Sequence, residues 1–210
     1  IRIRSKLPAF DPGRLLADEA RLDLLARHST AAKRIYVMAH FDHPRELCDL
    51  SLDLLDRLIR RGVIIVNQCP LLAGINDEPQ VLIQLFRRLS FAGVPPYYLF
   101  QCRPTAGNRA FQVPLVRGYG LFEAAKAGVS GLAKRARYVM SHASGKVEIV
   151  GLDARHLYLR YHRAKDTADE GRFLVYHRDE TACWLDDLTP VEGLGAPRPL
   201  PAGAQTDGPE

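Results

Sequence analysis

Polar side chains that can bind a ligand come at the ends of three successive apolar segments in the first half of the chain. In chain order they are His40, Asn67, Gln68, Gln101 and Arg103. An imidazole, three carboxamides and a guanidinium together donate and accept many hydrogen bonds, as a polar ligand requires. The alternative is that each group only bonds to loop backbone at a strand end. Because three successive segments repeat the pattern, we favour a ligand-binding site.

The segments that carry these residues predict a parallel sheet. Residues 35–41, 63–69 and 94–102 are rich in β-branched and aromatic residues, which is typical of buried strands. Leucines at helical spacing lie between them, with one helix expected to begin at Asp42 and the next near Asp77. Strand–helix–strand repeats of this kind indicate an α/β fold, in which ligands bind at the carboxyl ends of the strands.

The later part of the chain has a different pattern. A helix over 118–127 is followed by four short predicted strands, at 136–140, 146–151, 156–161 and 173–177. The turns between them contain Ser144 and Gly145 or fall in a polar stretch. From Pro190 onward, the Pro-, Gly- and Ala-rich composition predicts a disordered tail.

Composition and charge exclude several classes of protein. Of the 210 residues, 47% are hydrophobic and 25% are charged, and the net charge of +5 is spread along the chain rather than gathered as in a nucleic-acid binder. No apolar run is long enough for a membrane span, and no signal peptide is visible. The four cysteines lie far apart, so we expect no disulfides and a cytoplasmic protein. Because a predicted strand begins at Ile1, we expect a segment to precede it.

Five segments together resemble the lysine 2,3-aminomutase-type family of radical S-adenosylmethionine enzymes. The family elements HFNHP, NQSVLLRGVND, PYYIYQC, FRTPVSKG and SGY are matched in the same order and at similar spacing. The matching segments are HFDHP at 40–44, NQ with LLAGIND at 67–77, PYYLFQC at 96–102, FQVPLVRG at 111–118 and SG at 130–131. Each motif alone is weak, whereas the ordered set is specific.

The resemblance implies a partial (β/α) radical-SAM-type barrel with a mostly β C-terminal extension. It implies an isomerase that moves an amino group between adjacent carbons, with S-adenosyl-L-methionine, a [4Fe-4S] cluster and pyridoxal 5′-phosphate (PLP) as cofactors. The CxxxCxxC motif that ligates the cluster in the family is absent, so its ligands and the N-terminal half of the barrel are expected outside this chain. We therefore predict a barrel part at 1–132, a β extension at 133–189 and a disordered tail at 190–210. A homo-oligomer is a further expectation.

The resemblance assigns cofactor-binding roles to three residues. His40 and Gln68 match positions that line the S-adenosylmethionine site, and Lys146 matches the lysine that binds PLP covalently. By its spacing alone, Lys146 would be an exposed turn lysine, and His40 and Gln68 would form structural bonds at strand ends. A zinc site built from His40, His43 and Cys48 is a further alternative.

Substrate-selecting positions depart from the family pattern. Lysine-specific members have an aspartate just after the QC and another before the PLP lysine, where this chain has Arg103 and Ser141 or His142. A guanidinium repels an ammonium and attracts a carboxylate, so we predict an amino acid substrate with an acidic side chain. The alternative is that Arg103 points into solvent.

Other functions remain open beside the aminomutase-like isomerase. One is a protein-modifying aminomutase that acts in translation-factor lysylation, and another is a split or non-catalytic fragment, whose exposed sheet edge would require a partner. A generic α/β hydrolase or lyase would need an acid/base pair, for which His40 and Asp42 are the candidates.

Overall fold

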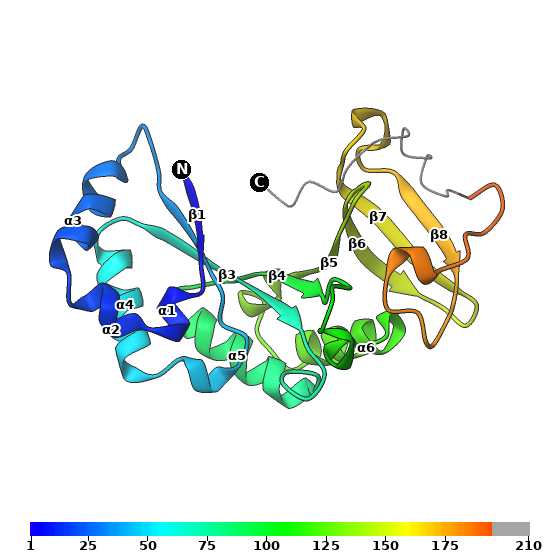
Figure 1. Cartoon of the computed structure of the whole chain (residues 1–210), viewed down its shortest axis with the longest axis horizontal. Helices are drawn as coiled ribbons and strands as arrows, with labels where there is room; N and C mark the ends of the chain where they lie inside the picture. Colours follow the sequence, from blue (N-terminus) through cyan, green and yellow to red (C-terminus); the bar gives the residue numbers. More distant parts are fainter. Residues whose placement is uncertain (195–210) are drawn as a thin grey trace. The chain divides into compact units, whose positions relative to one another are not determined.

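The computed structural model describes residues 1–194, which form two compact units (Figure 1). Unit 1 comprises Ile1–Pro70, Ile75–Leu99 and Glu123–Ala136. Unit 2 comprises Leu71–Gly74, Phe100–Phe122 and the described residues from Arg137 onward. Most of the predicted disordered tail, residues 195–210, lies outside the described residues.

Unit 1 is built on parallel strands, as the apolar segments predict. Strand β2 (Tyr36–Ala39) pairs in parallel with β1 (Arg2–Ser5) and with β3 (Ile64–Leu71), so that Val37 lies between Ile3 and Ile65. Strand β4 (Pro96–Gln101) follows β3 in the strand order. Parallel strands need crossover connections, and helices supply them here.

Two amphipathic helices cover the strands of unit 1 on one side (Figure 1). These are α4 (Asp49–Arg60) and α5 (Pro79–Phe91), and each buries an apolar stripe. The predicted stripe of α5, which contains Leu82, Leu85 and Leu89, is fully buried and is confirmed. Each of these helices is followed by a glycine with positive φ, where a left-handed conformation ends the helix.

The predicted helix start at Asp42 is wrong. A short 3-10 helix, η1 (Pro44–Glu46), comes first, and α4 begins only at Asp49. The later start changes the buried face: Ser51 and Leu55 are buried, whereas Leu50, expected in the apolar stripe, is 56% exposed. In place of Asp42, His43 caps the short helix through its Nδ1, and the Glu46 carboxylate bonds back to the N–H groups of Asp42 and His43.

Three helices between β1 and β2 were not predicted from the sequence. They are α1 (Leu7–Phe10), α2 (Pro12–Leu16) and α3 (Glu19–His28). Asp11 and Asp18 cap the second and third through hydrogen bonds to Arg14 N and Arg21 N. An aspartate directly before a proline or glutamate is the sequence signal that could have identified these two starts.

Unit 2 is an antiparallel sheet packed against a helix. Its strands are β5 (Arg137–His142), β6 (Gly145–Leu152), β7 (His156–Ala164) and β8 (Phe173–His177), and each pairs with the next. Helix α6 (Leu115–Ala127) begins with Leu115 N bonded to Ala182 O at 2.8 Å. Three short 3-10 helices complete the unit: η2 (Arg109–Phe111), η4 (Thr167–Asp169) and η5 (Leu185–Asp187).

The segment after η5 continues the sheet of unit 2. His177 N bonds to Thr189 O, Val191 N bonds to Val175 O, and Val175 N bonds to Leu194 O, at 2.9 to 3.2 Å. The described residues at the start of the predicted tail, 190–194, therefore lie along β8 instead of leaving the fold.

The fold is mixed α/β, in agreement with the coarse prediction. The eight strands of the described residues follow one another in chain order within one sheet, which is not closed. No helix among these residues has both the length and the apolar composition needed to cross a bilayer. The radical-SAM-type barrel stays a prediction.

Candidate functional site

Two of the predicted ligand-binding residues are in direct contact at the strand ends of unit 1. The Nε2 atoms of His40 and Gln68 lie 2.6 Å apart. A carboxamide nitrogen only donates, so the His40 Nε2 must accept, and the neutral imidazole carries its proton on Nδ1. The bond thus fixes the orientation of both side chains and leaves His40 Nδ1–H and Gln68 Oε1 as the polar atoms that it does not use.

The neutral state of His40 agrees with its surroundings. Burial lowers the pKa of His40, and the positive charges of Lys6 and Arg4 lower it further against an opposing effect of Asp42. A protonated ring would also place two donors against each other at Gln68. Near pH 7, His40 is therefore a neutral hydrogen-bonding group.

Asparagines hold the loop after β2 in place. Asn67 receives a bond from Phe41 N at 2.8 Å and donates to Phe41 O at 3.0 Å. The buried Asn76 donates to Asp42 O and Pro70 O, each at 2.9 Å. For Asn67, the alternative of loop-backbone bonding is therefore the role that the structure shows, and this role serves to position the neighbouring His40.

Gln101 has a similar structural role in unit 2. Its Nε2 donates to Val113 O at 2.7 Å and to Cys183 O at 2.8 Å, and its Oε1 accepts from Tyr138 Oη. Since all three hydrogen bonds are intramolecular and the side chain is buried, Gln101 stabilises the core instead of facing a ligand.

An ion-paired lysine lies beneath the loop after β2. Lys6 Nζ is 2.8 Å from Asp42 Oδ2 and 2.6 Å from Glu46 Oε1, and it also bonds to His40 O. Burial raises the pKa of the Asp42 carboxyl group, while Lys6 opposes this effect. His40 and Asp42, the acid/base pair that a generic hydrolase would need, are thus engaged with Gln68 and with Lys6 respectively.

The structure also brings Ser141 and Lys146 together in unit 2. They are opposite each other in the pair formed by β5 and β6, so their side chains lie on the same face. Lys146 Nζ lies 5.2 Å from the centroid of the Phe100 ring, within cation–π range. Lys146 is half-buried: it is neither fully exposed nor deeply buried.

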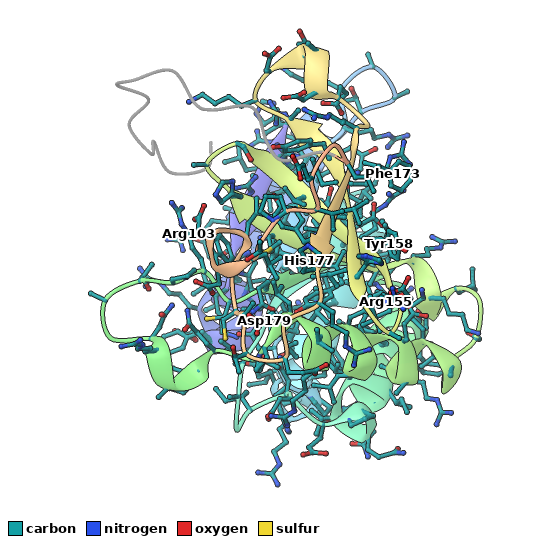
Figure 2. The ribbon with its side chains drawn as sticks, turned by 90° about the vertical axis from the view of Figure 1, so that its right-hand side faces the viewer. Arg103, Arg155, Tyr158, Phe173, His177 and Asp179 are labelled. Atoms are coloured by element: carbon teal, nitrogen blue, oxygen red, sulfur yellow. The ribbon has the colours of Figure 1, made fainter. Side chains whose placement is uncertain are left out.

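Arg103 lies in the loop after β4 and is exposed. Its carbonyl oxygen accepts a bond from Asn108 Nδ2 at 2.6 Å, which fixes its backbone. Figure 2 shows Arg103 on the opposite side of that view from Tyr158 and Phe173 of the outer strands. The exposed side chain suits either a charged ligand or solvent, so its predicted role in substrate selection stays a prediction.

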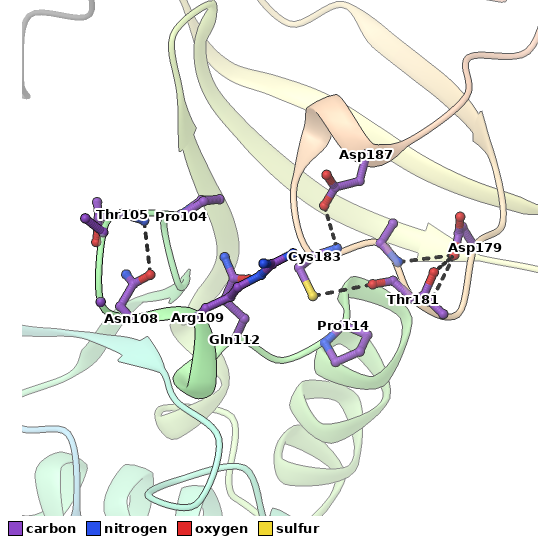
Figure 3. A pocket seen from close by; sticks show the side chains of 13 residues that line it. Pro104, Thr105, Asn108, Arg109, Gln112, Pro114, Asp179, Thr181, Cys183 and Asp187 are labelled. Carbon is purple, nitrogen blue, oxygen red and sulfur yellow. Dashed lines mark hydrogen bonds between the residues drawn. The ribbon is translucent and has the colours of Figure 1, made fainter.

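A polar hollow of about 930 Å³ lies in unit 2 between the loops 104–114 and 179–187 (Figure 3). Many of its polar groups bond to one another: Asp187 accepts from Cys183 N at 2.9 Å, and Asn108 accepts from Thr105 N at 3.0 Å. The predicted site residues are not among the described residues that line it.

The described residues contain no group of three or more His, Cys, Asp or Glu side chains that could hold a metal ion. In the alternative zinc site, His43 Nδ1 accepts from Arg45 N, and His40 Nε2 contacts Gln68. The four cysteines are free thiols. These residues therefore do not fit a [4Fe-4S] cluster or a zinc ion.

Sequence reasoning missed Lys6, Asn76 and Phe100. Asn76 and Phe100 lie inside the matched motifs, so the resemblance contained them without indicating their contacts. Lys6 lies 36 residues before the aspartate that it binds, and no local pattern reports such a contact.

We expect His40 to make folding stability depend on pH. Because its pKa is lower in the folded state than the ordinary value of about 6.5, the unfolded chain binds the proton more strongly. The contribution of His40 to folding stability is therefore fully present above a pH of about 6.5 and is lost as the pH falls below it. Denaturant unfolding should show that the free energy of unfolding falls less between pH 7.5 and pH 5.5 for His40→Gln than for the wild type. Equal losses would contradict the assignment.

The sequence comparisons agree with the motif pattern. A protein of Aquifex aeolicus named "Putative L-lysine 2,3-aminomutase" is 47% identical over 190 residues, which are 90% of this chain and 51% of that protein. The L-lysine 2,3-aminomutase of Methanococcus maripaludis is 32% identical over 145 residues, or 69% of this chain and 32% of that enzyme. This chain is a homologue of the lysine 2,3-aminomutases.

The aminomutase homology covers both units of the chain. The chain spans about half the length of the Aquifex aeolicus relative. No family model matches the sequence. A crystal structure of Plasmodium falciparum PdxK is similar over 80% of this chain and 56% of that chain, at 10% identity and a TM-score of 0.34, a likeness too low to support a conclusion.

Proposed function

We propose that this chain is part of an aminomutase-like isomerase in which His40 and Gln68 bind S-adenosylmethionine and Lys146 binds PLP. The observation that carries the proposal is the 2.6 Å contact between His40 and Gln68, which are 28 positions apart. The resemblance assigns both to one ligand, and side chains that share a ligand must lie close together. The homology to lysine 2,3-aminomutases supports the same reaction class.

The residues around Lys146 fit a PLP site. Lys146 shares a sheet face with Ser141, whose hydroxyl can bond to a polar group, and lies over the Phe100 ring, which can pack against a planar heterocycle.

In this proposal the residues of the chain bind and orient the cofactors. His40 Nδ1–H supplies one donor and Gln68 Oε1 one acceptor. The two side chains are held by their mutual bond and by the hydrogen bonds of Asn67 to the neighbouring backbone at Phe41. PLP, when bound, would stabilise charge or an unpaired electron on the atom next to the migrating nitrogen. The described residues offer no cluster site, so we propose that cluster ligands come from outside them.

We also propose a substrate with an acidic side chain. Arg103 is exposed in the loop after β4, where a guanidinium can pair with a carboxylate in a bidentate manner. The prediction of a cytoplasmic enzyme and of a homo-oligomer stays a prediction.

The test is chemical trapping of PLP on the full-length gene product. After incubation with PLP and reduction with borohydride, peptide mapping should place the pyridoxyl group on Lys146. The exposed Lys134 serves as the internal control. We expect Lys146→Ala to lose this adduct and the associated absorption band, while its Tm stays close to that of the wild type because the side chain is only half-buried.

Labelling spread equally over the lysines would contradict the PLP assignment. With cofactors reconstituted under anaerobic conditions, turnover of glutamate faster than lysine would support the role of Arg103. Faster turnover of lysine would contradict that role while leaving the assignment of Lys146 intact.

A further inference from the structure

A chain of hydrogen bonds surrounds the turn that joins β5 to β6. His142 Nδ1 lies 2.7 Å from Ser144 Oγ and 3.1 Å from Ser144 N. On the other side of the ring, His142 Nε2 lies 3.2 Å from Asp186 Oδ1. Tyr161 Oη donates to Ser144 Oγ at 2.8 Å. Side chains from β5, the turn, β7 and η5 thus meet at a single short turn.

The donors and acceptors in this chain have only one consistent arrangement. The Ser144 backbone N–H can only donate, so His142 Nδ1 accepts and the neutral ring carries its proton on Nε2, which faces the Asp186 carboxylate. Because Tyr161 donates to Ser144 Oγ, the serine hydroxyl donates onward to His142. All the bonds therefore run in one direction, from Tyr161 to Asp186.

A serine, a histidine and an aspartate in sequence suggest a hydrolytic triad, but burial argues against this role. Ser144 is only 7% exposed and Tyr161 only 2% exposed, so a substrate cannot reach the serine oxygen. A nucleophile needs its own hydroxyl oxygen free for attack, whereas Ser144 Oγ already accepts from Tyr161. The group is therefore a structural clamp.

The clamp acts on the backbone that precedes Lys146. Ser144 O accepts from Lys165 N at 2.8 Å, which ties the turn to the end of β7. Gly145 has a φ of +139°, and Lys146 follows it directly. Since Lys146 is paired with Ser141 next to His142, the conformation of the turn sets where the Lys146 side chain begins.

We propose that His142 is a positioning residue for Lys146. It holds the Ser144 backbone through Nδ1, so that Lys146 Nζ stays over the Phe100 ring. The inference deepens the proposed function and rests on it for the role of Lys146.

Two variants of the full-length protein separate the contributions of the ring nitrogens. His142→Ala removes both bonds. His142→Asn retains an acceptor at the place of Nδ1 and loses the bond to Asp186, which is 72% exposed and expected to contribute little. In His142→Ala we expect faster amide hydrogen exchange at Ser144 and Lys165, and roughly tenfold less PLP trapped on Lys146 after borohydride reduction. In His142→Asn we expect values near those of the wild type.

Hydrogen exchange separates this inference from the proposed function. If PLP is not trapped on Lys146 in the wild type, the proposed function fails, while exchange at the turn still tests the clamp. Unchanged exchange and unchanged trapping in His142→Ala would overturn the inference. If His142→Ala does not fold, His142→Asn decides, because a loss of trapping in that folded variant would equally overturn the role assigned to Nδ1.

Discussion

Replacing Gly118 by alanine should strongly destabilise the protein, although alanine is the better helix former. Gly118 lies in α6, where the change would gain up to about 1 kcal/mol of helix propensity. A Cβ there would lie 2.9 Å from Tyr138 Cζ and 3.0 Å from Leu71 Cδ2, and closer still to Tyr138 Oη. Overpacking of a core costs about 1–3 kcal/mol and more where the neighbours cannot move. The clash therefore outweighs the gain in propensity.

Tyr138 cannot move aside easily. It is fully buried, and its hydroxyl donates to Gln101, whose amide is bonded to two backbone carbonyls. For a net loss of about 2 kcal/mol, we expect thermal denaturation to show a Tm lower by roughly 4–8 °C for a chain of this size.

Gly120→Ala is the matched control for Gly118→Ala. Gly120 lies two residues further along the same helix, and a Cβ there would meet nothing within 4 Å. This variant should equal or exceed the wild type in Tm. A double-mutant cycle adds a second check, because Tyr138→Phe should cost less in the Gly118→Ala background than alone. A Gly118→Ala protein as stable as Gly120→Ala would contradict the packing argument.

Gly145→Ala is expected to have an effect at least as large. The φ of +139° is one that side chains with a Cβ rarely adopt, which costs about 1–3 kcal/mol. The new Cβ would lie 2.8 Å from Ala164 Cα and closer still to Arg163 O. Both are backbone atoms of the paired strand β7, so relief requires β6 and β7 to separate at this end. We expect a loss of about 3 kcal/mol or more, measured by chemical denaturation.

Gly151→Ala provides the comparison within β6. Its φ is not positive, and a Cβ there would make an ordinary 3.9 Å contact with Tyr158 Cδ2. Its stability should lie within about 1 kcal/mol of the wild type. If Gly145→Ala folds with the stability of Gly151→Ala, the tight approach of the turn to β7 is not a constraint on the fold. The turn would then not fix the position of Lys146.

The sheet could be predicted from the sequence because its signals are local. The apolar segments that became β2, β3 and β4, and the polar turn that became the connection from β5 to β6, are continuous in the sequence. The start of α4 was predicted too early, because His43 and Glu46 form a capping box around the short helix η1 and α4 begins only after it. Helix α1 has only four residues and a proline, too few for a periodic pattern.

The candidate site was predictable only in its residue types. The resemblance supplied His40, Gln68, Ser141 and Lys146. The structure adds that the first two are in contact and that the last two lie opposite each other in β5 and β6. It could not supply Phe100 as the neighbour of Lys146, since that contact joins β4 to β6. Likewise, His142 was one of two candidates for a substrate-binding position, and only its bonds to Ser144 and Asp186 reveal a structural role.

Residues 189–194 lie along the outer edge of β8 and bond to it at Val175 and His177. A truncation before Thr189 would leave the N–H groups of both residues and the Val175 carbonyl facing solvent. Unpaired strand edges recruit strands from other molecules, so such a shortened protein would be prone to aggregate. A cut after Leu194 keeps these bonds, which makes that position the safer place to end the chain or to attach a tag.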